Sequence, residues 1–178
     1  KAHEETAPDF VHTPASDIPV VSLGASEVRV LIGEAFGHTS PVKTFSKTVY
    51  LDIRLAAGEH LDLPPLADEL ALYGVEGDLA VDGEAVAART LAVLAPGMVA
   101  RISASEAARF VVIGGDPLDG HRFIWWNFVS SRKERIVQAG GDWAAQRMGQ
   151  VTGETEFIPL PQRKPARAEA ATDRTPYL

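Results

Sequence analysis

The chain has 178 residues, of which 46% are hydrophobic and 23% charged, an ordinary composition for a globular domain with tails. Its 17 basic and 24 acidic residues give a net charge of −7, so we expect no broad basic surface and no direct binding to nucleic acid. The absence of cysteine excludes disulfides, thiolate zinc sites and thiol catalysis, and it is consistent with a cytoplasmic protein. No apolar run approaches the length needed to cross a bilayer, so no membrane association is predicted.

Short apolar runs separated by turn residues follow one another over most of the chain. They cover residues 28–32, 48–55, 70–75, 78–81, 90–94, 98–102 and 109–113. Strict alternation within residues 48–55 places four apolar side chains on one face of a half-buried strand: Val49, Leu51, Ile53 and Leu55. Asp82-Gly83 predicts a tight hairpin turn. About eight short strands with no helical period between them predict an all-β antiparallel sandwich or barrel.

The pattern changes to a helical one after residue 130. Ser131 and Glu134 have the spacing of a capping box, which predicts a helix start. We expect helical structure over about 131–147, interrupted at Gly140-Gly141, with Asp142 capping a second short helix. Residues 1–20 are predicted to be an extended linker, 21–161 the folded domain and 162–178 a polar tail.

Titratable residues do not form a recognisable site. None of the five histidines lies two, three or four positions from another, so no pair shares a strand or helix face, and surface or capping roles are predicted. The adjacent carboxylates Glu4 and Glu5 diverge on regular structure and are interpreted as solvated charges.

Two glycines and a Pro-Gly turn form the more informative pattern. Gly58 and Gly77 have the spacing of the two glycines in the first cupin motif, and Pro96-Gly97 resembles the turn of the second. The positions where metal ligands would fall hold side chains without a donor atom: Pro64, Leu66, Leu70 and Ala100. In an alternative alignment the last position is Arg101, which would repel a cation if it were buried. His60 is out of register. We therefore predict no catalytic residue, no metal ligand and no cofactor in this chain.

A longer and more specific pattern lies between residues 124 and 161. It begins Ile124-Trp125-Trp126-Asn127-Phe128-Val129-Ser130-Ser131-Arg132-Lys133-Glu134-Arg135-Ile136 and continues through Asp142-Trp143 to Glu156-Phe157-Ile158-Pro159-Leu160-Pro161. These residues, together with Gly33-Glu34-Ala35-Phe36-Gly37, resemble the C-terminal domain of the pirin family over roughly residues 17–161.

This resemblance implies a bicupin, an all-β double-stranded β-helix (jelly roll) whose second barrel carries a short C-terminal helical appendage. In that family the N-terminal half carries iron on three histidines and a glutamate, and the C-terminal half is a degenerate cupin. Pirins are associated with quercetin 2,3-dioxygenation and with co-regulation of transcription factors. None of the iron ligands can be carried over onto this sequence, so iron is expected in an N-terminal half that is absent here.

The resemblance leads us to expect a supporting role, in which this domain packs on and completes an iron-binding N-terminal cupin. A module that binds a regulatory protein and a stand-alone barrel for a small ligand are the alternatives. Five residues are candidates for an interface: Trp125, Trp126, Phe128, Arg132 and Trp143. On a strand, Trp125 and Trp126 would point to opposite faces, which predicts one tryptophan in the barrel and the other beneath the following helix. The alternative is that one of them lies against the N-terminal half. An isolated chain with such a surface could also form a homodimer.

Overall fold

The computed structural model describes residues 2–7 and 9–161, so the predicted tail at 162–178 lies outside the described residues. The chain divides into two compact units. One consists of Thr13–Pro117, and the other contains the described residues before Thr13 together with residues 118–161. Helices that could span a membrane do not occur in the described ranges.

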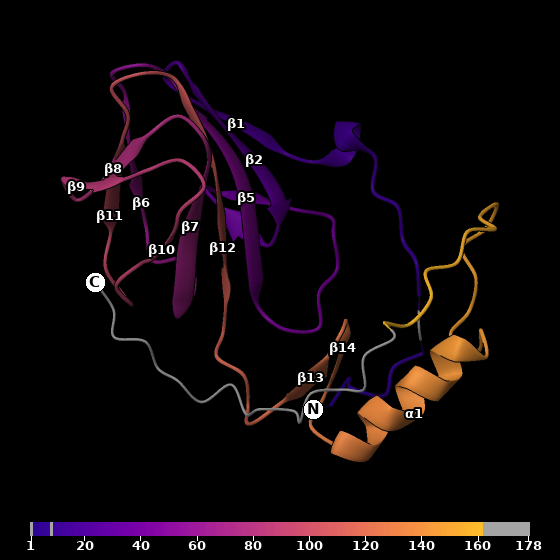
Figure 1. Cartoon of the computed structure of the whole chain (residues 1–178). Coiled ribbons are helices and arrows are strands. Elements are labelled where there is room, and N and C mark those ends of the chain that lie inside the picture. The colour runs from indigo at the N-terminus through magenta and orange to yellow at the C-terminus, as the bar shows by residue number, and fades with distance from the viewer. Residues whose placement is uncertain (1, 8, 162–178) are drawn as a thin grey trace. The chain divides into compact units, whose positions relative to one another are not determined.

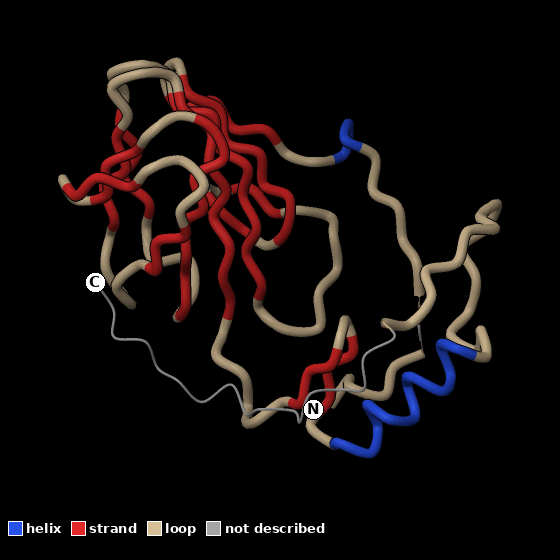
Figure 2. Tube along the Cα trace, viewed as in Figure 1, coloured by secondary structure: helices blue, strands red, loops and turns tan. Residues whose placement is uncertain are grey.

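The unit formed by Thr13–Pro117 is a two-layered antiparallel β-structure (Figures 1 and 2). Its larger sheet has the order β1 (Val20–Leu23), β2 (Ser26–Ile32), β5 (Thr48–Leu55), β12 (Ala108–Gly115), β7 (Glu69–Glu76) and β10 (Leu91–Val93). The smaller sheet has the order β6 (His60–Leu63), β11 (Ala100–Ser103), β8 (Leu79–Val81) and β9 (Glu84–Val86). A ribbon of β3 (Glu34–Ala35) and β4 (His38–Thr39) and a short 3₁₀ helix, η1 (Ala15–Asp17), complete the unit.

The core of this unit lies between the two sheets, because each sheet turns one apolar face inward. The predicted alternation in β5 is confirmed: Leu51 and Ile53 are fully buried, whereas Tyr50 on the other face is only half-buried. Phe110 and Ile102 contribute fully buried side chains from the larger and the smaller sheet, respectively. The apolar inner faces therefore explain why the sheets pack together.

Tight turns explain how the chain passes between strands. Asp82 and Gly83, with φ of 51° and 89°, form the predicted two-residue hairpin between β8 and β9. Gly77, with φ of 75°, lies where the chain leaves β7 in one sheet for β8 in the other. A Cβ at Gly77 would stand 2.9 Å from the Ala107 carbonyl oxygen, so this close approach also requires glycine.

The other unit contains the hairpin of β13 (Phe123–Trp125) and β14 (Phe128–Ser130), followed by helix α1 (Lys133–Ala144). The predicted interruption of the helix is wrong, because α1 runs through Gly140 and Gly141 without a break. Tertiary packing explains why α1 contains a glycine at this position. A Cβ at Gly140 would lie 2.9 Å from the Trp125 ring, so the glycine lets the ring approach the helix. Asp142 therefore lies inside α1 and caps no second helix.

The predicted capping box is also wrong. The N-cap residue is Arg132, and it makes no side-chain cap. The Ser131 hydroxyl donates to Glu4 instead of bonding to the first turn of the helix. The predicted all-β architecture with a C-terminal helical appendage is nevertheless confirmed. Several strands of two to four residues, such as β6 and β9, escaped prediction because so short a segment shows little periodicity.

Candidate functional site

The cupin ligand positions lie against the hydrophobic core of the two-sheet unit. Leu70 and Ala100 are buried in that core, and Leu66 packs against it half-buried. Ala100 in β11 stands opposite the buried Leu63 of β6. Hydrocarbon side chains and the half-buried Pro64 provide no lone pair for a cation. Within the described ranges, no group of three or more His, Asp or Glu side chains could hold a metal ion.

The polar residues nearest to these positions in sequence face away from the core. Arg101 is exposed, so the alternative alignment that would bury it is not realised. Its guanidinium donates to both carboxylate oxygens of Asp62 on the neighbouring strand, at 2.7 and 2.9 Å. This pairing raises the pKa of Arg101 and lowers that of Asp62. His60 is exposed on the same strand as Asp62, so it does not enter the barrel.

Four of the five predicted interface residues meet in one aromatic cluster, which we define as Trp125, Trp126, Phe128, Trp143 and Phe157. The Trp126 ring lies 5.4 Å from Phe128 and 5.2 Å from Trp143, both edge to face. Trp143 stacks on Phe157 with 5.8 Å between ring centroids. Such contacts add to the free energy gained by burying the rings. The cluster joins the hairpin, the helix and the segment that follows it.

The expectation that the two tryptophans point to opposite faces of a strand is wrong. Trp125 ends β13, but Trp126 occupies the two-residue turn before β14 and has a left-handed φ of 54°. Alternation applies only within a strand, so both rings can reach Phe128. Neither tryptophan belongs to the buried core of the two-sheet unit, so the predicted place in the barrel is wrong. The predicted place beneath the helix is confirmed for Trp125, whose ring packs against Gly140 of α1.

Trp143 also carries a directed polar contact. Its indole Nε1 donates to the backbone carbonyl of Ile158 at 2.7 Å. A single side chain from α1 therefore binds the segment after the helix by stacking on Phe157 and by hydrogen bonding to Ile158. This combination explains how a segment with no regular secondary structure is held to the helix.

The carboxylates of Glu4 and Glu5 bind the start of helix α1. The Ser131 backbone N–H and hydroxyl both donate to Glu4, the hydroxyl at 2.8 Å. Arg132 and Arg135 donate to Glu5. Donation by Ser131 lowers the pKa of Glu4 to about 2, and the bond from Arg132 is the main cause of the lowered pKa of Glu5. The interpretation of this acidic pair as solvated charge is therefore wrong, and Arg132 lies outside the aromatic cluster.

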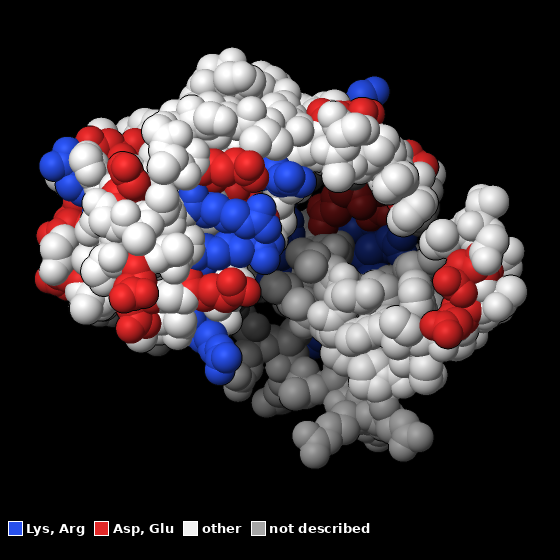
Figure 3. All heavy atoms as spheres, turned by 90° about the horizontal axis from the view of Figure 1, so that it is seen from above, with Lys and Arg blue, Asp and Glu red and all other residues white. Residues whose placement is uncertain are grey.

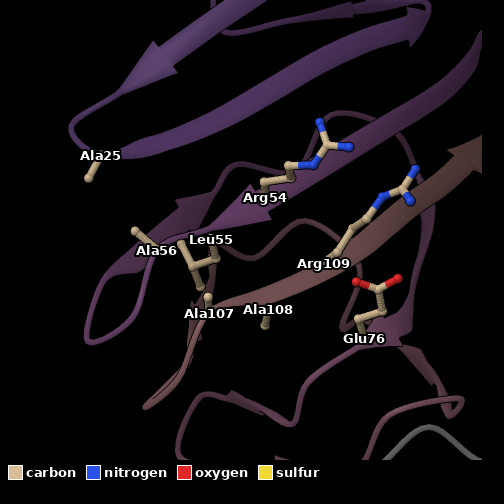
Figure 4. A pocket seen from close by; sticks show the side chains of 8 residues that line it. All are labelled: Ala25, Arg54, Leu55, Ala56, Glu76, Ala107, Ala108 and Arg109. Atoms are coloured by element: carbon tan, nitrogen blue, oxygen red, sulfur yellow. The ribbon is translucent and has the colours of Figure 1, made fainter.

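A hollow of about 410 Å³ lies beside the larger sheet, at the end where β5 finishes and β12 begins (Figure 4). It is lined by Ala25, Arg54, Leu55, Ala56, Glu76, Ala107, Ala108 and Arg109. The guanidinium of Arg109 donates to both oxygens of Asp52 at 2.9 Å, which lowers the pKa of Asp52. Arg54 lies 3.5 Å from Glu27.

The charges around this hollow therefore compensate one another. On the face of the molecule seen in Figure 3, basic and acidic side chains are likewise interspersed and do not gather into a broad basic surface. This distribution agrees with the acidic net charge of the sequence.

Comparison with known proteins identifies the relatives of this chain. The family model described as the pirin C-terminal cupin domain matches residues 50–149. A pirin-like protein of Caulobacter vibrioides is 40% identical over 161 residues, which cover 89% of this chain and 56% of that protein. Human pirin is 29% identical over 80% of this chain and 51% of its own length. A crystal structure of quercetin 2,3-dioxygenase from Acinetobacter baumannii is 26% identical, with a TM-score of 0.74 over 86% of this chain and 53% of that one. The chain thus spans about half the length of the curated relatives it matches.

Proposed function

The chain belongs to the pirin family as a C-terminal cupin domain, and on this premise we propose that it acts as the non-catalytic half of a two-domain protein. In this role it packs on an iron-binding N-terminal cupin and completes it. The relatives support such an arrangement because the matched region covers only about half of their length.

The residue types at the cupin ligand positions are the main support for the proposal. A cupin iron site needs imidazole and carboxylate donors that converge inside the barrel. The corresponding positions here hold Pro64, Leu66, Leu70 and Ala100, of which Leu70 and Ala100 are buried among apolar neighbours. The residues of this barrel do not fit iron, so we assign no reaction step to it.

The proposed activity of the whole protein is quercetin 2,3-dioxygenation. The proposal draws on the quercetin 2,3-dioxygenase of Acinetobacter baumannii, whose matched part aligns with 86% of this chain. Any such reaction would take place in the N-terminal half, which in this proposal carries the iron. The contribution of this chain would be structural, since its interior offers a packed apolar core.

The test begins with the coding sequence upstream of Lys1, which should encode a histidine-rich cupin. The two-domain protein and the present chain are then compared for iron content and for oxygen uptake with quercetin. We expect iron and turnover only in the two-domain protein. The variant His60→Ala controls for adventitious binding by the histidine closest to the ligand positions, and it should leave both readouts unchanged. Turnover by the present chain alone would contradict the proposal, and so would an upstream sequence without a cupin.

A further inference from the structure

The outer face of the larger sheet changes from apolar to charged along the direction of its strands. Strand pairing defines three rows of outward side chains across β10, β7, β12, β5 and β2. The first row is uncharged throughout: Val93, Ala71, Ile113, Tyr50 and Ile32. The second is apolar toward the β10 edge and charged beyond it: Leu91, Tyr73, Val111, Asp52 and Arg29. The third follows a register shift that skips Val75, and its paired side chains are all charged: Glu76, Arg109, Arg54 and Glu27.

The uncharged corner of this face is exposed. We define the apolar outer patch as Tyr73, Leu91, Val93 and Ile113, all of which are exposed to solvent. Leu91 stands opposite Tyr73, and both Val93 and Ile113 stand opposite Ala71, so the four side chains form one continuous surface. Single exposed apolar residues are ordinary, but contiguous groups mark surfaces that other molecules cover.

The patch extends to the edge of the sheet. Strand β10 ends the strand order next to β7, as Figure 1 shows, and two of its three residues belong to the patch. Soluble proteins usually protect an edge strand with lysine, proline or a covering segment. Strand β10 has the sequence Leu-Ala-Val and carries no charge.

The ion pairs beside the patch complete the pattern of an interface. Asp52 with Arg109 and Glu27 with Arg54 lie on the same outer face, in the neighbouring rows. An apolar centre with charged residues at its border is the usual anatomy of a protein–protein contact. The side chains on this face come from regularly paired strands, which suits packing against a second sheet about 10 Å away.

We infer that the apolar outer patch is the surface on which the N-terminal half of the same protein docks. This inference rests on the proposed function and adds to it the residues that make the contact. The curated relatives contain roughly as much chain again as the matched region, enough for a second barrel with its own sheet. Because that half is covalently attached, a small apolar patch suffices, since a short tether raises the effective concentration to about the millimolar range.

Cysteine labelling tests the inference directly, because the present chain contains no cysteine. Val93→Cys places a thiol in the patch, and Val99→Cys is the matched control on the segment that enters β11 of the other sheet. The two valines are 49% and 55% exposed. In the isolated chain both thiols should react with a maleimide at similar rates. In the two-domain protein Val93→Cys should react about tenfold or more slowly, because a covered thiol reacts only when the contact opens, whereas Val99→Cys should be unchanged. Peptide mass spectrometry locates the label.

A second pair of variants tests the energetic role of the patch. Leu91→Lys with Val93→Lys should separate the two halves, observed as rapid proteolytic cleavage of the connection between them. Met98→Lys with Val99→Lys should leave cleavage slow, because these two residues are also exposed but lie outside the patch.

The outcomes separate this inference from the proposed function. Equal labelling of Val93→Cys in an iron-loaded, quercetin-oxidising two-domain protein would overturn the docking surface and leave the proposed function standing. Slow labelling in the isolated chain, together with sedimentation as a dimer, would assign the patch to a second copy and would also overturn the inference. An upstream sequence without a cupin would refute both proposals.

Discussion

Replacing Ile53 by alanine perturbs the centre of the larger sheet. Ile53 lies in β5, is fully buried, and is flanked across the strands by Val28 and Phe110, which are also fully buried. Strand β5 is paired on both sides, with β2 and with β12. The backbone around the deleted side chain is therefore held by two neighbouring strands and can move little to fill the space.

The expected loss of stability follows from this packing. The substitution removes three buried carbon atoms, which contribute about 0.8 kcal/mol each through the hydrophobic effect. A residual cavity adds to this because the paired strands limit relaxation. We expect the free energy of unfolding to fall by about 3–4 kcal/mol, within the usual range for removing a large aliphatic side chain from a core.

The assay must report on the unfolding of the two-sheet unit, because Ile53 lies in that unit. All three tryptophans lie between residues 125 and 143, outside the two-sheet unit, so their fluorescence does not report directly on Ile53. Far-UV circular dichroism in a urea titration follows the strands. With a urea dependence of about 2 kcal/mol per molar, the midpoint for Ile53→Ala should fall by about 1.5–2 M.

Tyr50→Ala is the matched control, because Tyr50 lies in the same strand but faces outward and is half-buried. It should cost about 1 kcal/mol or less, the usual contribution of cross-strand pairs on one face. A loss for Tyr50→Ala equal to or greater than that for Ile53→Ala would refute our assignment of the inner and outer faces of β5.

Three further results are expected. Gly141→Ala should stabilise α1 by about 0.5–1 kcal/mol, whereas Gly140→Ala should destabilise it because the added methyl would meet the Trp125 ring at 2.9 Å. Thermal unfolding followed by tryptophan fluorescence compares the two variants, and equal effects would contradict the packing of Trp125 against Gly140. The folded-state pKa of Glu4, about 2, lies below its ordinary value of 4.5, so its contribution to stability is complete above pH 4.5 and is lost as the pH falls toward 2. Glu4→Gln should therefore loosen the segment before residue 13 already at pH 7, because a neutral amide oxygen accepts the bonds from Ser131 more weakly than a carboxylate does. Faster proteolysis of that segment measures the effect, and an unchanged cleavage rate would argue against the bond to Ser131. Elemental analysis of the desalted chain should find no stoichiometric metal, and near-stoichiometric iron, nickel or zinc would refute our interpretation of the ligand positions.

The sequence by itself determined the features that depend on neighbouring residues. The alternation of residues 48–55 identified the buried face of β5, because side chains on a strand point to opposite faces with a period of two. Asp82-Gly83 identified a hairpin, because both residues accept a left-handed φ at low cost. The ligand positions could be judged from residue type alone, since leucine and proline side chains lack donor atoms wherever the fold puts them.

Only the tertiary structure decided the features that join distant residues. Ser131 has the local spacing of a capping residue, but a carboxylate 127 positions away binds its hydroxyl. Gly140 has the local character of a helix breaker, but the ring of Trp125 packs in the space that a side chain would fill. The apolar outer patch combines residues from β7, β10 and β12, whose neighbourhood depends on strand order. Local sequence patterns describe structural propensities within a few residues, whereas these tertiary contacts form only when the chain has folded.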